Sequence, residues 1–460
     1  MPDTEVFTFS CPAAIHGDDT DHVLRRVIET DGFPSAEVLR EEFLEPEPNP
    51  FIRYRRLLRS YQYARAADWR PEGWDQVVEI LDRSLRAMAG RGLVVTPFEP
   101  DPDLAQALGV EALWVKDETG NVGGSHKVRH LLGLILWLEV VRRSGKSGEP
   151  ELLAIASCGN AALAAGIVAG VAGRDLQVFV PPDANEAIVE ELERLGAGVS
   201  ICGRQSGVPG DPCMHRFRKA VEAGALAFSC QGPENSEVIE GGQTLAYEMI
   251  STLLEREARL DRVLIQVGGG ALAAAVMGGF EEAHVLGLID RVPRFHTVQT
   301  MGASPLARAW ERVADRLVAD MAGGGEPPVE AGERAAWIAA NASETEIARA
   351  LNMAATHRSE FMWPWEDEPK SVADAILDDE TYDWLVPVGS MLRTGGYPLT
   401  VSEESLLEAH RLAGEHTLIP VDVTGSAGLA GCLGLVEAGE LSASESVAVL
   451  FTGIERGGDS

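Results

Sequence analysis

The stretch Gly123–Arg129 (GGSHKVR) places one lysine, Lys127, between a glycine pair and a strongly apolar helical run. Ser125 is a good N-cap residue, and apolar residues recur behind it at helical spacing, which predicts a helix starting here. Lys127 then lies in the first turn, where the positive helix end and Arg129 both disfavour a second cation. Such a lysine is suited to attack an aldehyde. From this segment alone, an ordinary solvated helix start is the better interpretation.

A second turn of small residues, Ser157-Cys158-Gly159-Asn160, separates an expected strand from an expected helix. Free amides at a helix start form a site suited to a carboxylate. Gly159 allows close backbone approach, and Asn160 can donate a hydrogen bond to a phenolate oxygen. An ordinary capped turn is an equally good interpretation. Cys158 has no base beside it and is interpreted as structural.

A third turn, Gly268-Gly269-Gly270-Ala271, again ends an expected strand and starts a helix. Consecutive glycine amides in such a turn form a nest for a phosphate group. The turn lacks the GxGxxG pattern of a dinucleotide site and the GK[ST] of a P-loop. A tight packing turn is the alternative, and three adjacent glycines favour phosphate binding over it.

Short apolar runs alternate with helical patterns from about residue 95, as in 176–180 followed by 186–195. This alternation predicts an α/β fold with mostly parallel sheets flanked by helices. Residues 1–94 are interpreted as a helical N-terminal extension, acidic at first and then rich in arginine. Residues 311–370 interrupt the alternation as an insertion.

The composition excludes several classes of protein. The chain has 460 residues, 45% of them hydrophobic, and a net charge of −32, which argues against nucleic acid or an anionic membrane as a partner. The six cysteines show no CxxC spacing and no HExxH pattern occurs, so we expect a cytoplasmic protein without a metal site. The N-terminus lacks the features of a signal peptide.

Taken together, these segments resemble the tryptophan-synthase-β-like (fold type II) pyridoxal phosphate enzymes, and among them threonine synthases and serine/threonine dehydratases most. The resemblance covers roughly residues 95–310 and 370–455. Asn121–Arg129 resembles the family's NPTGSFKDR, Ser157–Asn160 its SxGN turn, and Glu240–Glu248 its EGqkTlafE stretch.

The resemblance implies that Lys127 carries pyridoxal 5'-phosphate as an imine and that Asn160 contacts the ring. The phosphate belongs on Gly268–Ala271. Val423–Ala430 resembles the family's PSGAAalA segment, in which a hydroxyl meets the pyridine nitrogen. By that match Thr424 is the partner, with Ser426 as second choice. The implied substrate site consists of Ser125, His126, Ser157, Cys158 and Gly159.

The resemblance also implies two domains. The large cofactor-binding domain is expected over 95–150 and 246–460, including the insertion, and the small domain over 151–245. The expected partners are a small amino-acid substrate and a second copy of the chain in a homodimer.

Two departures from the family pattern concern the substrate. Val122-Gly123-Gly124 replaces the family's PTG, and His126 and Val128 replace the phenylalanine and aspartate that flank the lysine. We therefore do not expect O-phosphohomoserine as the substrate. His126 is the nearby side chain expected to titrate near neutrality. A packing role in place of phenylalanine is the preferred interpretation for it.

The function expected from these residues is a pyridoxal-phosphate-dependent amino-acid lyase, with β- or γ-elimination of the dehydratase or ammonia-lyase type. A replacement enzyme resembling threonine synthase or cysteine synthase is the alternative. A non-catalytic protein that binds the cofactor is less compatible with Lys127, Asn160 and the glycine turn.

Overall fold

A six-stranded sheet forms the larger part of the computed structural model, which describes residues 8–15, 17–146, 148, 150–204, 211–321, 327–366 and 369–456. The strand order is β1-β2-β10-β7-β8-β9. β1 runs antiparallel to β2, and the other pairs in this sheet are parallel. The strands are β1 (Phe98–Pro100), β2 (Ala112–Asp117), β10 (Ser446–Phe451), β7 (Arg262–Gln266), β8 (Arg294–Thr300) and β9 (Leu399–Val401).

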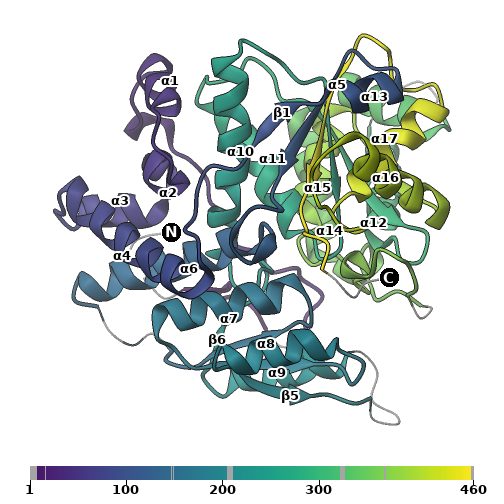
Figure 1. Cartoon of the computed structure of the whole chain (residues 1–460). Coiled ribbons are helices and arrows are strands. Elements are labelled where there is room, and N and C mark those ends of the chain that lie inside the picture. The colour runs from purple at the N-terminus through teal and green to yellow at the C-terminus, as the bar shows by residue number, and fades with distance from the viewer. Residues whose placement is uncertain are drawn as a thin grey trace.

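A second sheet has four parallel strands in the order β5-β4-β3-β6. It lies with its helices in the lower, teal part of Figure 1. We propose that this unit is the smaller domain predicted for 151–245. Its elements are β3 (Leu153–Ala156), α7 (Asn160–Ala172), β4 (Leu176–Val180), α8 (Glu186–Arg194), β5 (Gly198–Ile201), α9 (Pro212–Glu222) and β6 (Leu226–Ala227).

The predicted fold class, α/β with mostly parallel sheets flanked by helices, is confirmed. β7 is buried along its whole length, as expected for a strand covered on both faces. The strand starts at Arg262, one residue before the apolar run, and the backbone of Arg262 is in register with Val447 of β10 and Arg294 of β8. The apolar run thus locates this strand to within one residue at its start.

Seven further helices cover the larger sheet or connect it to the smaller one. α10 and α11 pack closely because Gly279 lies at their contact, where a Cβ would come within 2.6 Å of the Ala246 methyl group. These helices are α5 (Pro102–Leu108), α6 (Lys127–Arg143), α10 (Val238–Glu255), α11 (Ala271–Val285), α15 (Leu385–Thr394), α16 (Glu403–His416) and α17 (Ala427–Glu437).

The N-terminal region is helical, as predicted. Its helices are α1 (Ala36–Leu44), α2 (Pro50–Arg53), α3 (Arg59–Ala66) and α4 (Pro71–Ala89), drawn in purple and blue at the left of Figure 1. The apolar faces of α3 and α4 share one hydrophobic cluster with α6 and α7. The Arg59 guanidinium stacks over the Trp137 ring at 4.1 Å. The extension therefore braces the helix that starts at Lys127.

Residues 18–26, here called the N-terminal strap, cross the outside of the larger unit. Arg26 donates to Glu282 at 2.6 Å and to the Leu57 carbonyl at 2.5 Å, and it also pairs with Glu240. Nearer the start of the strap, Asp21 accepts a hydrogen bond of 2.5 Å from the Trp384 indole. The strap thus joins the helical extension and α10 and α11 to the segment that precedes α15.

The insertion expected at 311–370 is itself helical. α12 (Pro305–Asp320), α13 (Ala331–Asn341) and α14 (Glu344–Thr356) bury Trp310, Ile338 and Ile347 in the core of the larger unit. Gly323–Pro328 is predicted to be a loop from its glycines and prolines, and most of it lies outside the described residues, which omit 322–326. The insertion therefore extends the large core.

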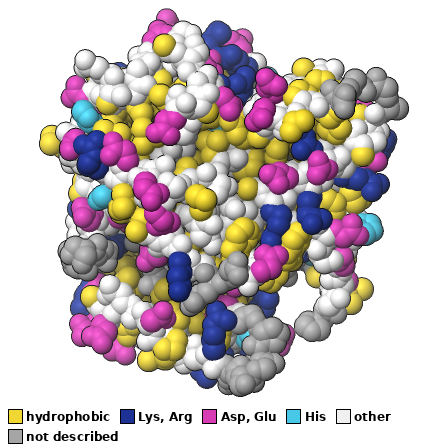
Figure 2. Space-filling view, turned by 90° about the vertical axis from the view of Figure 1, so that its right-hand side faces the viewer, with side chains coloured by type: hydrophobic (Ala, Val, Ile, Leu, Met, Phe, Trp, Pro, Cys, Tyr) yellow, Lys and Arg dark blue, Asp and Glu magenta, His cyan; other side chains and the backbone are white. Residues whose placement is uncertain are grey.

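Acidic and basic side chains are interspersed over the face seen in Figure 2. Within the described part of the chain, no helix is both long and apolar enough to cross a bilayer.

Candidate active site

The three turns singled out in the sequence all follow the carboxyl ends of parallel strands, where ligands bind in open α/β sheets. Lys127 is the first residue of α6 and follows the short 3-10 turn Val122–Gly124. Ser125 is extended, with φ −162°, and forms a bridge with Gly453. The helix therefore starts two residues after Ser125, whose hydroxyl accepts only a long hydrogen bond of 3.5 Å from the Lys127 amide.

His126 is buried beside Lys127, with 7% of its surface exposed. Burial and the neighbouring charge of Lys127 hold its pKa well below the usual value, so the ring is neutral at pH 7. The expectation that His126 titrates near neutrality was therefore wrong. Its ring lies edge-on to His130 at 5.9 Å, and neither ring nitrogen has a well-formed hydrogen bond among the described residues. Packing in place of phenylalanine agrees with this environment.

The glycine turn is closely covered by residues 376–383. A Cβ on Gly268 would lie 2.4 Å from Oδ2 of Asp378, and one on Gly269 would lie 3.2 Å from the Tyr382 ring. Gly270 has φ +93°, which favours glycine. The backbone amide of Gly269 interacts with the Asp378 carboxylate. The amides of the glycine turn therefore already interact with an acidic side chain, Asp378.

Asp378 and Asp383 are acids near Lys127 that the sequence analysis missed. Burial raises the pKa of Asp378 to about 6, although the Lys127 charge and the Gly269 amide act to lower it. Some of the Asp378 surface reaches solvent, whereas Asp383 is buried and accepts a hydrogen bond of 3.0 Å from Gly232. Burial raises the pKa of Asp383 to about 7. Both carboxylates therefore lie within electrostatic reach of the lysine.

In the second turn, Asn160 is the first residue of α7, and its Oδ1 accepts a hydrogen bond of 2.8 Å from Arg456. Arg456 also donates to the Gly123 carbonyl at 2.7 Å, so it joins this turn to the loop before Lys127. Burial and nearby acids raise the pKa of Cys158, so its thiol stays protonated at pH 7. The Ser157 hydroxyl accepts a hydrogen bond of 3.5 Å from the Gly159 amide.

The turn with Thr424 and Ser426 lies beside the loop before Lys127. A Cβ on Gly425 would lie 2.7 Å from the amide nitrogen of Gly453, the residue bridged to Ser125. Ser426 is fully buried and donates to the Val423 carbonyl at 3.2 Å, so its hydroxyl serves its own turn. Thr424 is half-buried. Of the two hydroxyls, Thr424 is therefore the one available for a ring nitrogen.

A fully buried ion cluster lies next to the lysine, two residues along α6. Arg129 donates to Glu118 at 2.9 Å and to Glu248 at 2.6 Å, and Lys116 pairs with Glu248 at 2.5 Å. All four side chains are 0% exposed, and their charges cancel. The cluster ties the start of α6 to β2 and α10.

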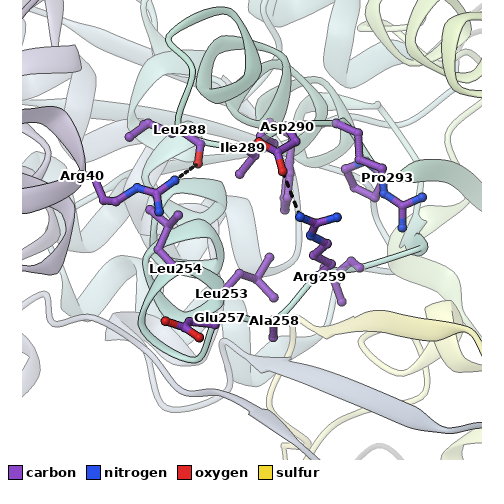
Figure 3. A pocket seen from close by; sticks show the side chains of 13 residues that line it. Arg40, Leu253, Leu254, Glu257, Ala258, Arg259, Leu288, Ile289, Asp290 and Pro293 are labelled. Atoms are coloured by element: carbon purple, nitrogen blue, oxygen red, sulfur yellow. Dashed lines mark hydrogen bonds and ion pairs between the residues drawn. The ribbon is translucent and has the colours of Figure 1, made fainter. Parts of the chain in front are cut away.

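Figure 3 shows a surface pocket formed by the end of α10, Arg40 and the segment Leu288–Pro293. Arg40 reaches the Leu288 carbonyl there, and Arg259 pairs with Asp290 at 2.9 Å. Because it lies by the residues that precede β7 and β8, this pocket is at the opposite edge of the sheet from the glycine turn. It is separate from the site around Lys127.

Lys127 lies within electrostatic reach of Asp378, whose carboxylate interacts with the Gly269 amide. On a two-sheet α/β fold, a lysine and a glycine turn of this kind are typical of an enzyme that binds a phosphorylated aldehyde cofactor. The chain belongs to the family of pyridoxal-phosphate dependent enzymes, whose model matches residues 91–364. The fold type II resemblance and the cofactor inferred from the sequence are confirmed.

The relatives include several threonine synthases. That of Methanocaldococcus jannaschii is 22% identical over 358 residues, which are 78% of this chain and 74% of that protein. Among solved structures, the processed form of threonine deaminase isoform 2 from Solanum lycopersicum has a TM-score of 0.55 at 15% identity, covering 84% of this chain and 86% of that one. Diaminopropionate ammonia lyase from Escherichia coli has a TM-score of 0.56 at 16% identity, covering 82% and 88%. At these identities the structures show the fold.

The residues around Lys127 fit pyridoxal phosphate. The glycine turn has backbone amides at a helix start and no room for a Cβ on Gly268 or Gly270, and it already interacts with a carboxylate. Asn160 has its oxygen bound to Arg456, which leaves its amide hydrogens for a ring oxygen.

Gly269→Val is expected to weaken cofactor binding on the order of tenfold to a hundredfold, because a side chain there pushes against Tyr382 and narrows the nest. The dissociation constant, measured by fluorescence titration of the cofactor-free protein, checks this. Gly414→Val is the control, since a Cβ on Gly414 meets no atom within 4 Å. Unchanged binding in Gly269→Val would move the phosphate elsewhere.

Asp378→Asn is expected to tighten cofactor binding about tenfold at pH 8 and to have little effect at pH 5. Above its pKa of about 6 the Asp378 carboxylate is charged and repels a phosphate on Gly269, and below that pH it is neutral. The ratio of wild-type to variant dissociation constants isolates this residue, because titration of any other group affects both proteins. Asp379→Asn is the control for the neighbouring charge. An equal ratio of dissociation constants at both pH values would contradict the placement of the phosphate beside Asp378.

Proposed function

We propose that the protein is a pyridoxal-phosphate-dependent amino-acid lyase, which eliminates a β or γ substituent from a small polar amino acid. Lys127 binds the cofactor through Nζ and, once the substrate is bound, moves the proton at Cα. When bound, the cofactor supplies an electron sink next to that carbon.

The other predicted residues have supporting roles in this proposal. The amides of Gly268–Ala271 hold the phosphate, and Asn160 faces the ring oxygen. The turn Ser157–Gly159 binds the substrate carboxylate at the start of α7. Thr424 contacts the pyridine nitrogen, and as a neutral partner it leaves that nitrogen unprotonated.

The observation that carries the proposal is the charge around Lys127. Asp378 and Asp383 both lie within electrostatic reach of the lysine, and the side chains of Val122–Gly124 include neither a hydroxyl nor a cation. The Arg456 guanidinium beside this loop donates to the Gly123 carbonyl and to Asn160. A distal phosphate, as in O-phosphohomoserine, would add a second anion near these acids, beyond the cofactor phosphate proposed beside Asp378. A leaving group that is neutral or positive fits this environment better.

The test is a substrate screen of the holoenzyme with serine, threonine, 2,3-diaminopropionate and O-phosphohomoserine. Release of a keto acid and ammonia from any of the first three supports the lyase. Efficient conversion of O-phosphohomoserine to threonine would overturn the proposal and leave the cofactor site intact.

A replacement enzyme is the second candidate, because the relatives quoted above include threonine synthases. It predicts turnover only when a second, nucleophilic substrate is added. If no amino acid changes the absorbance of the bound cofactor, a non-catalytic binding protein is favoured instead. A homodimer and a cytoplasmic location stay predictions, the first to be tested by light scattering and the second by cell fractionation.

A further inference from the structure

Arg456 connects two parts of the site that are far apart in the sequence. One nitrogen of its guanidinium, Nη2, donates to the Gly123 carbonyl at 2.7 Å and to the Asn160 side chain at 2.8 Å. Gly123 belongs to the loop that precedes Lys127, and Asn160 starts α7. Arg456 itself follows β10 and is half-buried.

The contact with Arg456 fixes which way the Asn160 amide points. A guanidinium has donors and no acceptor, so the amide atom that faces Arg456 must be the oxygen. The amide nitrogen of Asn160 then points away from Arg456, with both hydrogens available. Without this contact, rotating the amide by half a turn would present an oxygen in place of a donor.

We propose that Arg456 is a positioning residue for the cofactor, because it holds Asn160 with its amide nitrogen toward the phenolate oxygen of the ring. The inference rests on the proposed placement of the ring at Asn160. It assigns a role to a residue near the end of the described chain that has no part in the family motifs.

An effect of the Arg456 charge alone can be distinguished from the proposed positioning of Asn160. Arg456 also lowers the pKa of Glu191 on α8, and so does Arg194. Arg194 pairs with Glu191 at 2.6 Å on an exposed face. Arg194→Met therefore removes an arginine from the same glutamate and leaves the Asn160 contact in place, which makes it the matched control.

The test measures the cofactor dissociation constant of the full chain and the pH titration of the bound cofactor's absorbance. Arg456→Met is expected to weaken binding about tenfold and to shift the titration midpoint, whereas Arg194→Met does neither. Arg456→Lys, which keeps a charged donor, should recover part of the loss. Asn160→Ala should show the same shift, and adding Arg456→Met to Asn160→Ala should cost nothing further.

Two results would overturn the inference. If Arg456→Met matches the wild type in affinity and spectrum, or loses only thermal stability, Arg456 does not position the ring. If the double variant weakens cofactor binding by the product of the two single-variant factors, Arg456 and Asn160 act independently. Normal binding and spectrum in Asn160→Ala alone would overturn the placement of the ring as well, so the two failures are distinguishable.

Discussion

Lys127→Ala is expected to lower kcat by at least about a thousandfold, because the variant loses both the covalent link to the cofactor and the proton carrier at Cα. The side chain lies at the start of α6, within electrostatic reach of Asp378 and Asp383. Removing its charge should also raise the pKa of Asp378 above about 6, since Lys127 lowers that value.

Borohydride reduction followed by peptide mapping provides the direct measurement. The wild type should carry the reduced cofactor on Lys127, and Lys127→Ala should carry none. Lys146→Ala removes an exposed lysine that follows the same helix, and it should behave as the wild type. A label on any other lysine would refute the assignment, and with it the proposed mechanism.

Arg129→Met is expected to have the largest effect on stability, about 3–5 kcal/mol of unfolding free energy. The variant leaves Glu118 and Glu248 buried with one cation, Lys116, between them. Two carboxylates that share one cation in a dry environment are costly, since neither can be hydrated. Because Arg129 lies two residues after Lys127, loosening this cluster should also weaken cofactor binding.

Urea-induced unfolding, followed by tryptophan fluorescence, measures the loss. Arg142→Met is the control, because its ion pair with Glu139 lies on the exposed side of the same helix. That variant should lose less than about 1 kcal/mol. Adding Glu248→Gln to Arg129→Met removes the unpaired charge and should restore part of the stability. Similar losses in Arg129→Met and Arg142→Met would contradict the cost assigned to burial.

The sequence predicted those parts of the fold whose signals are local. The strand at 176–180 and the glycine turn at 268–270 each combine an apolar run with small residues over a few positions. Their bounds were therefore found within one or two residues. The family motifs single out Lys127 and Asn160 as site residues for the same reason, and their roles stay predictions.

The residues that the sequence did not reveal reach the site through tertiary contacts. Asp378 follows the insertion, and Arg456 lies almost 300 positions after Asn160, with a separation of 296. Neither has a distinguishing pattern of neighbours along the chain. Ser125 shows the same effect, since its bridge to Gly453 displaces the start of the helix that its own propensity predicts.

The N-terminal strap has a consequence for the order of folding. Asp21 is synthesised 363 positions before its partner Trp384. Arg26 likewise precedes its partner Glu282 by 256 positions. The strap can therefore close only after Trp384 has been synthesised, and such non-local contacts form slowly. Asp383, next to Trp384, gains its final surroundings only after that point, so the site should form late in folding.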